Sequence, residues 1–121
     1  MSRNVVLYLK DILQNMREAE DFVRGMSSAQ FAADKKTIYA VIRALEVIGE
    51  AAKNVPEAIR SGYPEIPWKE MAGMRDKLIH FYVGVDREAV WLVVHERIPL
   101  LKPVMERILR HLEIQEGGGQ S

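Results

Sequence analysis

The chain has 121 residues, of which 48% are hydrophobic and 28% charged, and it contains no cysteine. A chain of this length can form one domain with a core that needs no disulfide or metal, and the missing cysteines exclude zinc ribbons and thiol nucleophiles. The 17 basic and 17 acidic residues cancel, which argues against a protein that coats nucleic acid by bulk charge. No apolar run reaches the ~20 residues of a membrane span and the start lacks a signal-peptide core, so we expect a cytoplasmic protein.

The first half of the chain predicts two amphipathic helices. Over residues 5–23 the apolar side chains recur every three or four positions, at Val5, Val6, Leu9, Ile12, Leu13, Met16, Ala19 and Val23. Gly25 is placed to end this helix, and Ser27 or Ser28 offers a hydroxyl that can cap a short helical turn. Asp34 can cap a second long helix, whose stripe consists of Ile38, Val41, Leu45, Ile48, Ala52 and Val55.

The second half predicts two more helices after a connection at residues 54–67, which contains three prolines and one glycine. Pro67 suits the first position of a helix that carries Trp68, Met71, Met74, Leu78 and Ile79. Asp86 can cap the last helix, and its stripe consists of Val90, Val94, Ile98, Leu101, Met105, Ile108 and Leu112. Pro99 and Pro103 interrupt that stripe, so we expect a kinked helix. The chain is therefore predicted to be all-α, with one domain over residues 1–114 and a disordered tail at 115–121.

No motif for a metal or a nucleotide cofactor is present. Di-iron bundles use Glu-x-x-His pairs, and no glutamate stands three residues before His80, His95 or His111. Glycine-rich phosphate-binding loops are also missing. The sequence therefore predicts a protein without a metal or a cofactor.

A polar cluster at residues 75–82 carries groups suited to phosphoryl chemistry. Cleaving RNA without a metal needs a base for the 2′-hydroxyl proton, an acid for the leaving 5′-oxygen, and a cation for the charge on phosphorus. His80 can exchange protons near neutral pH, and Arg75 carries a permanent charge. Asp76 lies four residues before His80, close enough on a helix to fix its tautomer and favour the imidazolium. A structural alternative is a core histidine between Ile79 and Phe81.

Helix geometry separates the two candidate catalytic residues. Five residues at 100° each place Arg75 and His80 about 140° apart around an ideal helix and about 7.5 Å apart along it. Either the helix unwinds near residues 81–84, or a second copy of the chain completes the site across a two-fold axis. We favour a site completed by a second copy of the chain, with local unwinding near residues 81–84 as a contributing effect.

The last predicted helix has a local surplus of positive charge. Arg97, Lys102, Arg107 and Arg110 stand there against Glu106. These cations can track a phosphate backbone, or they can form an ordinary solvated helix face, which is the more common arrangement. His95 and His111 have no matching constellation and are assigned no role.

Two long stretches of the sequence resemble the HEPN superfamily, and within it the HepT family of toxin–antitoxin ribonucleases. Residues 40–56, AVIRALEVIGEAAKNVP, look like the second helix of that family. Residues 63–82, YPEIPWKEMAGMRDKLIHFY, followed by Gly84, Asp86 and Trp91, look like its signature stretch. The family has a characteristic pattern, which consists of Arg, a polar residue, three further residues, His, any residue and Tyr. In this sequence the pattern matches Arg75, Asp76, His80 and Tyr82.

The resemblance implies an up-and-down, HEPN-like bundle of four to five helices that forms a homodimer around a cleft. It also implies a metal-independent endoribonuclease, the toxin of a HepT/MNT-type module, in which Arg75 and His80 are required. The partner is an MNT-type nucleotidyltransferase, which silences the toxin by transferring AMP to a tyrosine that corresponds to Tyr82. In the absence of the family, Tyr82 would be interpreted as an aromatic anchor of the turn. The alternative function is a non-catalytic helical module that docks a nucleotidyltransferase.

Overall fold

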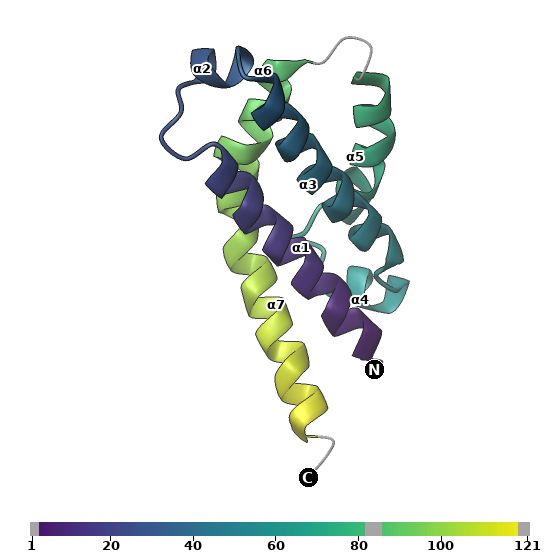
Figure 1. The fold of residues 1–121 in the computed structure, drawn as a ribbon. Coiled ribbons are helices and arrows are strands. Elements are labelled where there is room, and N and C mark those ends of the chain that lie inside the picture. The colour runs from purple at the N-terminus through teal and green to yellow at the C-terminus, as the bar shows by residue number, and fades with distance from the viewer. Residues whose placement is uncertain (1–2, 82–85, 119–121) are drawn as a thin grey trace.

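The structure, a computed structural model, describes residues 3–81 and 86–118, and only the backbone of residues 3, 75–81 and 116–118. Every regular element in this part of the chain is helical, which confirms the all-α prediction (Figure 1). The elements are α1 (Arg3–Phe22), α2 (Ser28–Ala32), α3 (Lys35–Asn54), α4 (Glu57–Gly62), α5 (Trp68–Phe81), α6 (Arg87–Leu92), the π-helical segment η1 (Val93–Arg97) and α7 (Ile98–Gly118).

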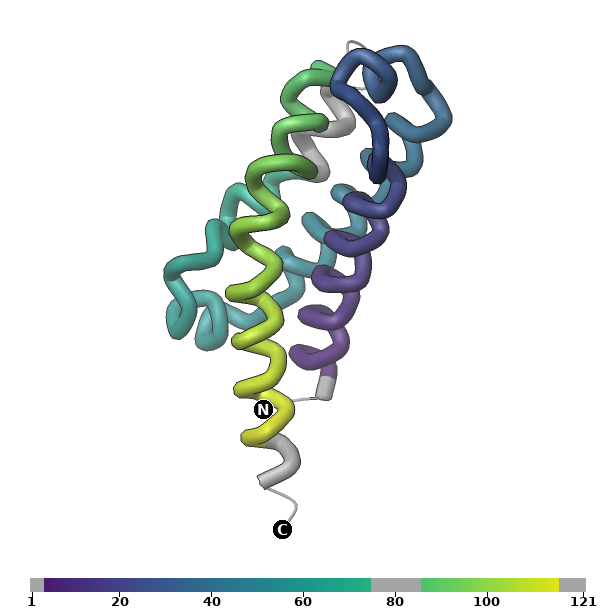
Figure 2. The backbone as a smooth tube through the Cα atoms, turned by 90° about the vertical axis from the view of Figure 1, so that its left-hand side faces the viewer, coloured from purple at the N-terminus to yellow at the C-terminus, as the bar shows by residue number. Residues whose placement is uncertain are grey.

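The long helices form an up-and-down bundle. In Figure 1, α1 and α5 run in one direction, whereas α3 and the continuous rod α6–η1–α7 run in the other. Helix α1 packs against α3 and α7, and α3 also packs against α5. Figure 2 shows that α7 lies beside α1 and extends beyond the first turn of α1. No helix in the described residues is both long and apolar enough to cross a membrane.

Among the residues whose side chains are described, one cluster of buried apolar groups joins the helices. Every member of the stripes predicted over residues 5–23 and 38–55 is buried. The side chains with 0% exposure include Leu9, Ile12, Val41 and Ala52. The spacing of three and four residues places these side chains on one face of each helix, so the periodicity predicts the core directly. On α7, Met105, Ile108 and Leu112 close the cluster.

Local capping explains where the helices begin and end. Gly25 has a φ of 79°, a left-handed conformation that favours glycine, and it ends the turn after α1. Ser27 and Gln30 form a reciprocal capping box at α2, in which the Ser27 Oγ accepts from the Gln30 N–H at 3.1 Å. Asp34 accepts from the Thr37 N–H at 3.1 Å, and Asp86 accepts from the Ala89 N–H at 3.0 Å. The predicted caps are therefore confirmed.

Two boundaries differ from the sequence prediction. Helix α5 begins at Trp68, one residue after Pro67, whose carbonyl oxygen accepts a hydrogen bond from the Met71 N–H at 3.0 Å. Proline has no N–H to donate, and here it contributes only its carbonyl to the first turn. Helix α7 continues through Gly118, so the expected boundary at residue 114 lies inside this helix. Residues 119–121 of the expected tail lie outside the described residues.

The irregularity expected from the prolines of the last helix takes the form of the π-helical segment η1. There the Ile98 N–H donates to the carbonyl of Val93, five residues earlier. In a regular α-helix the ring of Pro99 would clash with the carbonyl of His95, and the wider turn of η1 relieves that clash. The second proline, Pro103, lies inside α7.

Candidate active site

Helix α5, which carries the candidate catalytic residues, is anchored at its start. The Trp68 side chain is buried, and its indole Nε1 donates to the carbonyl oxygen of Tyr63 at 3.0 Å. Met71, one turn further along, is also buried in the core. The polar end of a buried tryptophan has a partner, as such groups require, and the helix is held against α3. This anchoring determines the position of the following turns, which contain residues 75–81.

The backbone of Arg75, Asp76 and His80 belongs to α5, which is helical through Phe81. Unwinding therefore does not begin before Phe81, and the separation of about 140° and about 7.5 Å between Arg75 and His80 applies to one unbroken helix. Asp76 is one turn before His80 on this helix. The side chains of these three residues, and all of Tyr82, lie outside the described residues.

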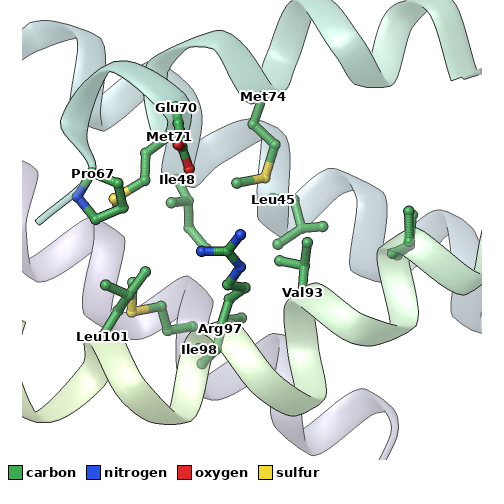
Figure 3. A pocket seen from close by; sticks show the side chains of 13 residues that line it. Leu45, Ile48, Pro67, Glu70, Met71, Met74, Val93, Arg97, Ile98 and Leu101 are labelled. Atoms are coloured by element: carbon green, nitrogen blue, oxygen red, sulfur yellow. The ribbon is translucent and has the colours of Figure 1, made fainter.

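An apolar pocket of about 280 Å³ lies between α5 and the rod α6–η1–α7. One of its lining residues, Met74, immediately precedes Arg75 in the chain. Met16, Leu45 and Ile48 from α1 and α3 line the pocket, together with Met71 and Met74 from α5. Two charged residues also line this pocket. Figure 3 shows the Arg97 guanidinium pointing into the pocket from the rod and the Glu70 carboxylate facing it from α5.

The cations of the last rod occupy different environments. Lys102 Nζ lies 2.5 Å from Oε1 of Glu20 on α1, and an Arg107 nitrogen lies 2.7 Å from Oε2 of Glu65. Among the described residues, Arg97 has no carboxylate partner within 4.0 Å. Arg110 is exposed. Two of the four cations are thus neutralised by pairs between distant segments, which favours the solvated-face interpretation over a continuous phosphate track.

Two features of the site region were not assigned by the sequence. Glu70 was not singled out, and only the fold brings it opposite Arg97. The His95 ring stacks on Trp91, with centroids 3.8 Å apart and an angle of 21° between the planes. A spacing of four residues on a helix is the signal that could have predicted this contact. Among the described residues, no group of three His, Asp or Glu side chains is placed to hold a metal ion.

Comparisons with known proteins agree on one family. The family model described as "Ribonuclease HepT-like" matches residues 12–108. A Thermococcus cleftensis protein named "Probable ribonuclease HepT" is 51% identical over 108 residues, which cover 89% of this chain and 98% of that protein. A "Putative RNase" of Methanocaldococcus jannaschii is 47% identical over 111 residues, covering 92% of each chain. No solved structure matches the chain significantly.

Proposed function

The chain belongs to the HepT-like ribonuclease family, and we propose that it is a metal-independent endoribonuclease in which Arg75 and His80 carry the chemistry. The observation that supports this most directly is that both residues lie on the core-anchored helix α5, inside the segment that the family model matches. The Thermococcus cleftensis protein named "Probable ribonuclease HepT" aligns with 108 of the 121 residues of this chain.

The proposed reaction is an internal transfer at phosphorus. The RNA 2′-oxygen attacks the adjacent phosphorus and loses its proton to a base, while the bond from phosphorus to the 5′-oxygen breaks and that oxygen gains a proton from an acid. The products are a 2′,3′-cyclic phosphate and a free 5′-hydroxyl. His80 serves as acid or base, and Asp76 orients its ring. Arg75 stabilises the charge that develops on the phosphate oxygens.

The geometry of α5 supports the proposal of a homodimer. Because α5 is continuous over these positions, ideal helix geometry separates positions 75 and 80 by about 140° around the helix axis. A two-fold axis beside α5 would bring Arg75 of one chain and His80 of the other to the same phosphate. The proposed active unit is therefore a dimer with the two signature stretches lining one cleft.

The proposed biological role is that of a toxin paired with an MNT-type nucleotidyltransferase as its antitoxin. The Tyr82 phenolic oxygen would bond to the phosphorus of AMP and lose its proton, and pyrophosphate would leave the ATP donor. Each AMP adds a negative phosphate and a bulky base two residues after His80. The added phosphate would compete with RNA for Arg75 and silence the enzyme.

The test is cleavage of a labelled single-stranded RNA by the purified chain in EDTA. Wild type should cleave, and Arg75→Ala and His80→Ala should each lower the rate at least about 100-fold. Arg17→Ala removes an exposed cation of α1 and should cleave like wild type. Equal rates for wild type and for both α5 variants, all folded by circular dichroism, would overturn the ribonuclease and favour the docking module.

A further inference from the structure

The pocket between α5 and the rod combines an apolar interior with one carboxylate and one guanidinium group. Apolar side chains from α1, α3, α5, α6, η1 and α7 line it, whereas Glu70 and Arg97 stand on opposite sides of it (Figure 3). Among the described residues, neither of these two charges has a partner within 4.0 Å. Both side chains are exposed, so each is available to a ligand that enters the pocket.

We propose that this pocket binds one unpaired guanine of the RNA substrate, next to the bond that is cleaved. Glu70 accepts hydrogen bonds from the base, and Arg97 binds a neighbouring phosphate. The proposal rests on the proposed ribonuclease function and adds a base-specific subsite to it.

The size and the lining of the pocket suit a nucleobase. Its volume of about 280 Å³ is slightly below that of typical small-molecule sites, which begin at about 300 Å³. Met71, Met74 and Val93 present flexible or branched apolar groups that can cover the two faces of a flat ring. Proteins that bind a splayed-out base hold it between apolar or aromatic side chains in this way.

The carboxylate of Glu70 selects among the four bases. Guanine presents two adjacent donors on its Watson–Crick edge, N1–H and the N2 amino group, and a carboxylate can accept from both with its two oxygens. Adenine and cytosine present an amino donor beside a ring acceptor, and that acceptor would face a carboxylate oxygen. Uracil presents one imino donor between two carbonyl oxygens. The geometry therefore favours guanine.

Arg97 and the place of the pocket connect this subsite to the cleavage site. Arg97 presents a fork of N–H donors that matches phosphate oxygens. Met74 lines the pocket and is the residue immediately before Arg75 on the same helix. A strand whose base enters the pocket thus has its backbone beside the turn of α5 that begins at Arg75.

The experiment uses four single-stranded RNAs that differ only in one base, G, A, C or U, beside a single susceptible bond. Wild type should cleave the guanine substrate about tenfold faster than the adenine one, and Glu70→Gln should bring that ratio close to one. The matched control Glu96→Gln removes an exposed carboxylate of η1 and should keep the wild-type ratio.

Binding of the same four RNAs, with 2′-O-methyl groups that block cleavage, is measured by fluorescence anisotropy. Arg97→Ala should weaken all four to a similar degree and lower the salt dependence by about one ion, whereas Arg17→Ala should change neither. Wild type without a base preference in binding, as would result if a second copy of the chain covered the pocket, overturns the subsite. A guanine preference that persists in Glu70→Gln also overturns it.

The cleavage and binding experiments together distinguish failure of the guanine subsite from failure of the ribonuclease activity. If wild type cleaves none of the RNAs but binds the guanine RNA best through Glu70, the proposed activity fails and the subsite stands. If wild type cleaves all four at equal rates, the activity stands and the subsite fails.

Discussion

The Nζ atom of Lys102 on α7 lies 2.5 Å from Oε1 of Glu20 on α1. Their side chains are 29% and 24% exposed, so solvent screens this ion pair less than a fully exposed one. The pair joins residues 82 positions apart and ties the last rod to the first helix. It also removes Lys102 from the cations that a nucleic acid could use.

This ion pair should contribute a measurable coupling to stability. Lys102→Met, Glu20→Gln and the double variant, compared by urea unfolding, should give an interaction energy of about 1 kcal/mol. The side chains are partly buried and the contact is a charge-assisted hydrogen bond, so the value should exceed that of an exposed pair. An interaction energy near zero would show that water satisfies both groups equally well after separation.

A mixture of inactive variants should recover ribonuclease activity if two chains share one site. Arg75→Ala supplies a chain with His80, and His80→Ala supplies a chain with Arg75. After unfolding and refolding together, half of the dimers are mixed and each has one complete pair out of two, so about a quarter of wild-type activity is expected. The measurement is RNA cleavage before and after mixing.

Failure to recover activity in that mixture would contradict a site shared between chains. The control is each variant refolded alone, which should stay inactive because neither homodimer contains a complete pair. Size-exclusion chromatography of the mixture verifies that dimers have reformed.

Tyr82 should be the residue that accepts AMP. Co-expression of the chain with an MNT-type nucleotidyltransferase should add mass in AMP-sized steps and lower RNA cleavage, because the added phosphate occupies the place of the substrate phosphate. Intact-mass spectrometry provides the measurement. Mass increments that survive Tyr82→Phe would exclude this tyrosine, and Tyr39→Phe, which alters an exposed tyrosine of α3, serves as the control.

The cap of α3 should make stability depend on pH in the acid range. The hydrogen bond from the Thr37 backbone N–H, followed by that from the Thr37 hydroxyl, lowers the pKa of Asp34 below its ordinary value of 3.8. Because the folded-state pKa is the lower one, the stabilisation is present above pH 3.8 and is lost as the pH falls through the folded-state value.

Asp34→Asn keeps a capping oxygen but carries no charge to titrate. The difference in Tm between wild type and this variant should therefore shrink in the direction of acid pH. Thermal unfolding by circular dichroism at several pH values provides the measurement. A difference that stays constant down to pH 2 would contradict the cap as the source of the pH dependence.

Much of the fold was predictable because the relevant signals are local. The stripes over residues 5–23 and 38–55 predicted the buried faces of α1 and α3, and side-chain caps at Ser27, Asp34 and Asp86 act within three residues. The prolines of the last helix led us to expect a kink, and the π-helical segment was not predicted. Helix α7 continues through Gly118, into a segment that the sequence analysis assigned to the tail because it lacks side chains to bury in a core.

The sequence by itself determined the helices, their buried faces and the family signature, in which Asp76 stands one position and His80 five positions after Arg75. These features depend on residues that are a few positions apart in the sequence, and such residues are neighbours in any helix. Only the tertiary structure decided which charges are neutralised and which remain available. Glu20 pairs with Lys102 and Glu65 with Arg107 across 82 and 42 residues, whereas Arg97 faces Glu70 over an apolar pocket. Helix packing sets such distances, and no local pattern encodes them.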